Sequence, residues 1–225
     1  MKGNKNMKKR TALIAIAAVV VLACAAVVGT IAYLTDTETV NNTFTVGNVE
    51  IKLDEAIVDE YGKPKEDSRT EEGNDKYKLV PGLTYTKDPT TTVLAKSEPC
   101  YVRNLVSISE AAALDAIFPN AETQLSAFFP DFDDTNWTLV GYTKTGDVRT
   151  YEIRYNTVVD ASKSDTDIPL PAPFKTVAVP SAVTGEQLAT IDGLTIDVVA
   201  QAIQSASFES DDEAWEAFEG QNSAA

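Results

Sequence analysis

The sequence changes character once, near residue 33, from a leader suited to a membrane to a body suited to water. Residues 1–10 are basic, and residues 12–28 form an unbroken apolar run of 17 residues. The apolar character resumes at residues 31–34 and then ends. A basic start followed by an apolar run and small residues is typical of a secretory signal peptide. We therefore expect only the part after the boundary to fold as a water-soluble domain.

Small residues mark the end of this leader. Thr30 and Ala32 stand at the two positions that a signal peptidase reads, and Tyr33 follows them. We predict cleavage between Ala32 and Tyr33. Residues 1–32 would then be the signal peptide, and residues 33–225 a single domain long enough to bury a core.

Two other interpretations of the leader stay open. Residues 12–34 span 23 residues, which is long enough for an uncleaved transmembrane anchor. Residues 21–24 also resemble a lipoprotein cleavage box that ends at Cys24. The chain stays apolar beyond Cys24, however, which is unusual for the start of a mature lipoprotein.

The stretch that crosses the boundary, residues 29–53, resembles the signal-peptide junction of the TasA/camelysin family. Its sequence is GTIAYLTDTETVNNTFTVGNVEIKL. The matching positions are Gly29, Thr30, Ala32, Tyr33, Leu34, Thr35, Asp36, Glu38, Asn42, Thr43, Phe44, Thr45 and Gly47. Weaker similarity follows at residues 79–89, 99–103 and 196–215.

This resemblance implies a protein secreted by a bacterium of the Gram-positive type and processed by a SipW-type signal peptidase. It implies a jelly-roll β-sandwich that serves as a fibre subunit of the cell surface or biofilm matrix. The partners would be other copies of the chain, joined when the N-terminal strand of one subunit completes the sheet of the next. The residues expected in this donor segment are Leu34, Asp36, Asn42, Phe44, Val46 and Gly47.

The body itself reads as mainly β, because short alternating stretches recur without a regular strand–helix alternation. The predicted strands are residues 43–53, 77–80, 90–95, 100–108, 137–142, 148–158, 174–179 and 194–204. Residues 54–78 are predicted to form a solvated loop with at most one short strand, and residues 168–173 an extended linker. The predicted short helices are two within 110–129, then 184–191 and 210–218. This pattern favours an antiparallel β-sandwich with a few decorating helices. Asn104 interrupts the apolar face of its strand, and the sequence offers no reason for it.

Charge excludes some partners. Loss of residues 1–32 removes five basic residues and no acidic one, which leaves 14 basic against 34 acidic residues and a net charge of −20. Such a body repels nucleic acid and anionic lipid, so we expect no nucleic-acid partner and membrane contact only through the uncleaved leader.

The two cysteines are Cys24 and Cys100, so cleavage after the leader leaves a lone thiol. No disulfide within the mature chain can form. A small buried core residue is the first interpretation of Cys100, and an intermolecular disulfide is the alternative.

The chain contains no histidine. A His-Glu-x-x-His zinc site, a Ser-His-Asp triad and a Cys-His pair are therefore excluded, and glycine-rich phosphate loops are absent. We predict a non-enzymatic structural protein without a cofactor. The alternatives are a camelysin-like secreted metallopeptidase, which the family label implies, and a monomeric surface-binding module.

One acidic turn is the weak candidate for a metal site. It consists of Asp131, Asp133, Asp134 and Asn136, whose oxygens could coordinate Ca²⁺. The turn lacks the glycine and the final glutamate of a helix–loop–helix calcium loop. The favoured interpretation is a solvated turn whose aspartates bind their own backbone.

Overall fold

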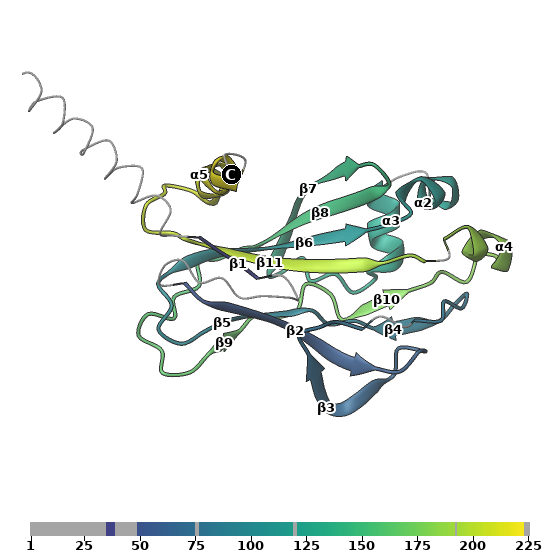
Figure 1. Ribbon diagram of the computed structural model, residues 1–225, viewed down its shortest axis with the longest axis horizontal. Helices are drawn as coiled ribbons and strands as arrows, with labels where there is room; N and C mark the ends of the chain where they lie inside the picture. Colours follow the sequence, from purple (N-terminus) through teal and green to yellow (C-terminus); the bar gives the residue numbers. More distant parts are fainter. Residues whose placement is uncertain (1–34, 39–48, 75–76, 119–120, 192, 223–225) are drawn as a thin grey trace, which may run out of the picture. The chain divides into compact units, whose positions relative to one another are not determined.

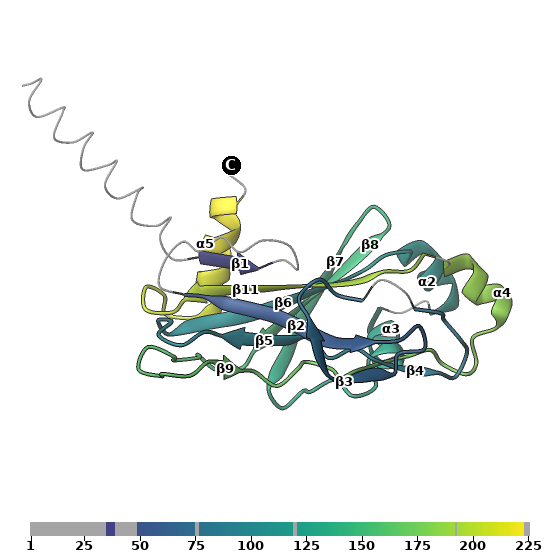
Figure 2. The same cartoon turned by 60° about the horizontal axis from the view of Figure 1, so that its bottom comes forward.

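The computed structural model describes residues 35–38, 49–74, 77–118, 121–191 and 193–222, which hold three antiparallel sheets and a few short helices. Figures 1 and 2 show the largest sheet facing the two smaller ones across the core. A mainly β fold was predicted, and these residues confirm it. Among them, no helix is both long enough and apolar enough to span a membrane.

The largest sheet has five strands in the order β1-β11-β6-β8-β7, all antiparallel to their neighbours. Its strands are β1 (Thr35–Glu38), β6 (Cys100–Ile108), β7 (Trp137–Thr145), β8 (Val148–Tyr155) and β11 (Ile196–Gln204). A two-residue turn at Gly146 and Asp147 joins β7 to β8, and Gly146 has a φ of 59°. A residue without a Cβ adopts this left-handed conformation at little cost.

The facing layer consists of two sheets. One has the order β3-β2-β5-β9, and the other pairs β10 with β4. Their strands are β2 (Ile51–Val58), β3 (Pro64–Thr70), β4 (Thr84–Thr86), β5 (Thr90–Val93), β9 (Ile168–Pro169) and β10 (Thr176–Ala178).

Short helices cover the ends of the sandwich. They are α2 (Ala111–Ile117), α3 (Ala121–Phe128), α4 (Gly185–Leu188) with the 3₁₀ turn η1 (Ala189–Ile191), and α5 (Asp211–Asn222). A capping box begins α4, because the side chains of Thr184 and Gln187 each bond the backbone N–H of the other residue. Helix α5 packs against β11 through Ile203, Ala214, Trp215 and Phe218.

The core lies between the layers. Ile51, Leu53 and Val93 come from one layer, and Val106 and Ile153 meet them from the other, all at most 4% exposed. Burying each such side chain contributes roughly 1.5–3 kcal/mol. Alternate residues of each strand point inward, which is why the sequence pattern identified most of these strands.

Asn104, unexplained by the sequence, bridges the two layers. Its Oδ1 accepts a hydrogen bond of 2.9 Å from the Thr91 hydroxyl of β5, and both residues are fully buried. The polar position in the apolar face of β6 therefore has a buried partner.

Three predicted segments differ from the structure. The strand predicted at residues 43–53 is β2, which begins at Ile51 and runs to Val58, and residues 43–48 lie outside the described part. The prediction of a loop with at most one short strand at 54–78 was wrong in part. Strand β3 is the one strand that begins and ends there, but residues 54–58 also belong to β2. Strand β3 is polar because it lies at an exposed edge of its sheet, where charged side chains are common.

The strand predicted at residues 77–80 was also wrong. The backbone there bonds a side chain instead of a neighbouring strand: Val80 N donates to the Tyr85 hydroxyl at 2.8 Å, and that hydroxyl donates to Lys78 O at 2.6 Å. Burial raises the pKa of Tyr85, so the phenol stays protonated and keeps this donor.

Candidate functional site

The N-terminal junction lies mostly outside the described residues. Of the predicted cleavage and donor residues, Ala32, Tyr33, Leu34, Asn42, Phe44, Val46 and Gly47 are not described, and Asp36 is. Asp36 lies in β1, opposite Ala202 of β11. The cleavage position and the donor segment therefore stay predictions.

Strand β1 is short and pairs with one neighbouring strand only. It has four residues, it forms the edge of the five-stranded sheet, and it pairs with residues 200–203 of β11. The first half of β11, residues 196–199, pairs with β6 on one side and has no strand on the other among the described residues. An edge of this kind offers backbone donors and acceptors to a further strand.

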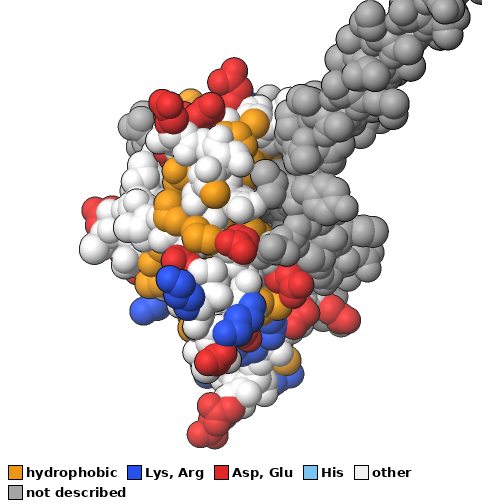
Figure 3. Space-filling model, turned by 90° about the vertical axis from the view of Figure 1, so that its left-hand side faces the viewer, with side chains coloured by type: hydrophobic (Ala, Val, Ile, Leu, Met, Phe, Trp, Pro, Cys, Tyr) orange, Lys and Arg blue, Asp and Glu red, His pale blue; other side chains and the backbone are white. Residues whose placement is uncertain are grey.

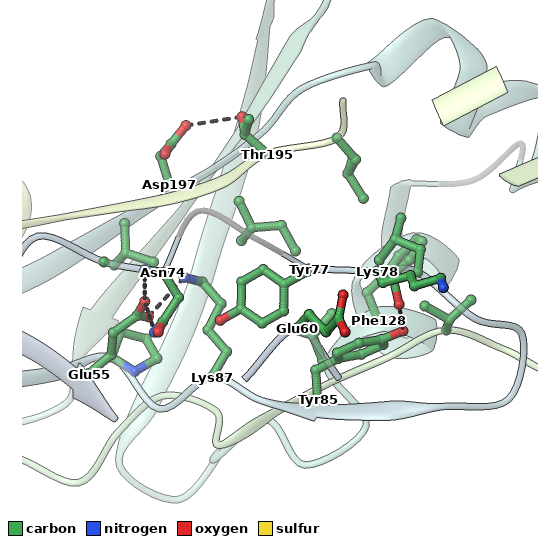
Figure 4. A pocket seen from close by; sticks show the side chains of 18 of the residues that line it. Glu55, Glu60, Asn74, Tyr77, Lys78, Tyr85, Lys87, Phe128, Thr195 and Asp197 are labelled. Atoms are coloured by element: carbon green, nitrogen blue, oxygen red, sulfur yellow. Dashed lines mark hydrogen bonds and ion pairs between the residues drawn. The ribbon is translucent and has the colours of Figure 1, made fainter. Parts of the chain in front are cut away.

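A cavity of about 1410 Å³ adjoins this half of β11 and opens between the layers (Figure 4). Its apolar wall has contributions from β2, β10, β11 and the helices at that end. These side chains are Leu53, Leu79, Phe128, Val177, Val179, Leu188, Ile191, Leu194, Ile196 and Val198. Thr195 and Asp197 lie on the β11 side, where their side chains bond each other at 3.1 Å.

A buried ion pair lies at one end of the cavity. Lys87 Nζ donates to Glu55 Oε2 at 2.8 Å, and the two side chains are only 9% and 7% exposed. The other carboxylate oxygen of Glu55 accepts from the backbone and side-chain nitrogens of Asn74. Each charge of the pair thus has partners that compensate for the loss of water.

Tyr77 lies beside this pair, as Figure 4 shows. Burial raises the pKa of its phenol, and the negative charge of Glu55 raises it further. Its ring meets Tyr85 edge to face, with the ring centres 5.8 Å apart. The phenol therefore stays neutral, and its ring lines the cavity next to the ion pair.

Two aspartates of the acidic turn at residues 131–136 accept hydrogen bonds from backbone N–H groups, Asp133 from its own turn and Asp131 from another segment. Asp133 accepts from the backbone of Thr135 and Asn136 and from the Asn136 amide. Asp131 accepts from the backbone of residues 175 and 176, and Asp134 is exposed. The weak Ca²⁺ candidate gains no support from these contacts.

In the part of the chain that the structure describes, no set of side chains fits a peptidase zinc. The chain has no histidine, and the described residues contain no group of three His, Cys, Asp or Glu side chains placed to hold a metal. Zinc sites in peptidases use histidine and carboxylate ligands around an open position. We therefore derive no catalytic step through a metal.

Sequence reasoning missed the cavity and the ion pair beside it. Glu55 and Lys87 are 32 residues apart, and Asn74 lies in a segment that was taken for a solvated loop. One signal was present: Glu55 occupies the inward phase set by Ile51 and Leu53. A charged residue in that phase requires a buried partner.

Residues 6–63 match the family model described as camelysin metallo-endopeptidase. The match confirms the resemblance predicted from the junction, and it covers the leader, β1 and β2. No curated protein and no solved structure matches the chain.

Proposed function

We propose, from the camelysin-family segment that the chain carries at its N-terminus, that this is a secreted structural protein of the cell surface or extracellular matrix. Copies assemble when the segment after the leader leaves its own sheet and completes the sheet of a neighbour. The jelly-roll arrangement implied by the family is part of the same proposal.

The single observation that supports this assembly best is the pairing of β1. Four residues on an edge give few backbone bonds, so exchange for an equivalent pairing in another copy costs little. Strand β1 also begins at Thr35, directly after the predicted cleavage position, so cleavage would free the chain on its N-terminal side.

The unpaired half of β11 supports a longer pairing in the assembled state. A donor strand that continued along residues 196–199 would reach the apolar wall of the cavity. In the register of β1, residues 39–42 would pair with residues 196–199. Phe44 and Val46 follow them, and we assign these donor side chains to the end of the wall near Leu194. Burying each is worth roughly 1.5–3 kcal/mol, which offsets part of the entropy lost on ordering the segment.

The surface is compatible with close association of copies. Figure 3 shows a face on which a band of hydrophobic side chains lies among acidic and basic ones, beside the residues that are not described. Interspersed charges of both signs allow copies to approach in spite of the net charge of −20 that residues 33–225 carry.

Assembly is tested on the secreted protein by light scattering and electron microscopy. Deletion of residues 33–42, and separately Phe44→Asp, should leave a folded, soluble body that forms less polymer than the wild type. The control is Val158→Asp, which changes an exposed apolar residue outside the segment and should polymerise normally. Polymerisation of either donor variant at the wild-type rate would rule out this mechanism.

A secreted metallopeptidase is the second candidate, favoured by the description of the matching family. Casein hydrolysis that survives repurification, stops with a chelator and returns with zinc would establish it. We expect no such hydrolysis, because a chain without histidine cannot provide the usual zinc ligands.

A further inference from the structure

Three side chains that carry complementary chemistry meet at the end of the cavity. Lys87 follows β4, Asn74 follows β3, and Glu55 lies within β2. Lys87 Nζ is bonded to Oε2 of Glu55, and Asn74 Nδ2 is bonded to Oε1 of the same carboxylate, each at 2.8 Å. One carboxylate therefore holds an amine and a carboxamide side by side (Figure 4).

The carboxamide is fixed and polarised. Asn74 Oδ1 accepts from the backbone N–H of Val58 at 3.0 Å, and Nδ2 also donates to Ala56 O at 2.8 Å. The N–H of Val58 points at the oxygen that would become negative if a nucleophile attacked the amide carbon. Backbone donors placed in this way stabilise the oxyanion of acyl transfer.

The amine and the carboxylate are shielded from water. Their side chains are 9% and 7% exposed, and the Tyr77 ring lies beside them (Figure 4). Transfer of one proton across the 2.8 Å bond converts the ammonium and the carboxylate to a neutral amine and a neutral acid. In a dry site this transfer removes two charges from a medium that solvates them poorly.

We propose that Lys87 and Asn74 become joined by an intramolecular amide bond, with Glu55 as the proton carrier. The neutral Nζ attacks Cγ of Asn74, and a new C–N bond forms as the C=O π bond opens onto Oδ1. Glu55 gives its proton to Nδ2 and takes one from Nζ. The Cγ–Nδ2 bond then breaks, the carbonyl re-forms, and ammonia leaves.

The atoms balance without a further reactant. A primary amide and the Lys87 ammonium give a secondary amide and ammonium, and no electron pair is gained or lost. Glu55 ends the exchange protonated, and it becomes ionised again when it gives that proton to the departing ammonia. Asn74 is only half-buried, and with Glu55 and Lys87 it lines the cavity of about 1410 Å³. The ammonia therefore has a way out, which makes the reaction irreversible in dilute solution.

The amide bond would give this chain an internal covalent cross-link, which its cysteines cannot form. Cys100 is the one cysteine among the described residues, and it is a free thiol. The new bond would hold the segment after β3 to the segment after β4, at the end of the cavity. This inference concerns the folded subunit and does not depend on assembly.

The decisive experiment is a tryptic map of the unmodified full-length chain after folding. Without the bond, trypsin releases residues 70–76, which contain Asn74, and residues 79–87, which end at Lys87. With the bond, Lys87 resists trypsin, and residues 79–96 remain joined to residues 70–76. The mass of the joined species is then lower than the sum of its two peptides by one ammonia.

Variants assign the roles of the three groups. Lys87→Arg keeps the ion pair but lacks a nucleophile, because the guanidinium is not deprotonated in proteins, and it should give only separate peptides. Glu55→Gln should lose most of the joined species. The control Lys144→Met removes an exposed lysine that pairs with Asp115, and it should give the joined species in full. Far-UV circular dichroism checks the fold of each variant.

The wild-type map alone can overturn the proposal. Separate peptides 70–76 and 79–87 from folded protein, with no joined species after prolonged incubation, would exclude the bond. A joined species that persists in folded Glu55→Gln would exclude Glu55 as the proton carrier. Loss of fold in a variant leaves the wild-type map as the deciding result.

Discussion

The guanidinium carbon of Arg103 lies 4.3 Å from the centre of the Trp215 ring, and this contact fastens helix α5 to the five-stranded sheet. Arg103 also bonds Gln201 of β11 at 2.7 Å and Glu219 of α5 at 2.5 Å. Its side chain is only 3% exposed, so the cation–π contact is largely desolvated and strong.

Trp215→Ala should detach α5 and lower the free energy of unfolding by about 3–5 kcal/mol, the cost typical of removing a buried aromatic side chain. Urea denaturation followed by circular dichroism measures the change. The matched control is Glu216→Ala, which alters an exposed residue of the same helix and should change stability little. Equal stability of the two variants would show that α5 contributes nothing to the fold.

The mature N-terminus should lie within two residues of Tyr33, because Thr30 and Ala32 precede it in a junction that the family match covers. N-terminal sequencing of the secreted protein decides the point. A start at Cys24 would favour the lipoprotein interpretation, and an intact Met1 on the extracellular product would favour the anchor.

The sequence predicted the strands in which apolar residues recur mainly at alternate positions. Strands β6 and β11, and the two strands of the β7–β8 hairpin, were all located in this way. The alternation misled where a charged residue occupies an inward position, or where a side chain and not a neighbouring strand bonds the backbone. Glu55 is buried because Lys87 pairs with it, a long-range contact that no local pattern contains.

The same limit applies to the candidate site. The junction was recognised because its residues are contiguous in sequence. The cavity brings together β2, β10 and β11, and the amide-forming group brings together residues 55, 74 and 87. Such a site exists only once the sheets have paired, so a reading of one sequence cannot place it.

Cys100 should resist alkylation in the folded protein. It is fully buried, and burial, with a smaller effect from the charge of Asp160, raises its pKa from 9.0 to about 12. The reactive thiolate is therefore scarce at neutral pH. Iodoacetamide should label Cys100 only after denaturation, as read by intact mass. Rapid labelling of the native protein would show that Cys100 is accessible, and it would favour the alternative that Cys100 forms an intermolecular disulfide.

The raised pKa of Cys100 also predicts a dependence of stability on pH. The folded state holds the thiol proton more tightly than the unfolded state, so the contribution is fully present below pH 9 and is lost as pH rises toward 12. Each unit of pH in that window should lower the free energy of unfolding by about 1.4 kcal/mol. Cys100→Ala removes this term, so the wild type should lose stability more steeply above pH 9. Parallel curves would contradict the assignment.

Gly62 and Gly146 allow a matched test of backbone strain against crowding. Both have positive φ, 74° and 59°, and they lie in turns. A Cβ on Gly62 would come within 2.5 Å of the Tyr85 Cα, whereas a Cβ on Gly146 would meet nothing within 4 Å. The two alanine variants therefore share the conformational cost, and only one of them adds a clash with the backbone.

Gly146→Ala should lower stability by about 1–2 kcal/mol, the cost of a left-handed conformation for an L-residue. Gly62→Ala should cost about 1–3 kcal/mol more, the range for overpacking at a tightly packed site. The extra loss arises because Tyr85 is anchored by hydrogen bonds to Lys78 and Val80 and cannot move aside freely. Urea denaturation of both variants gives the difference. Equal losses would mean that the segment around Tyr85 yields, and that the wall of the cavity there is not rigid.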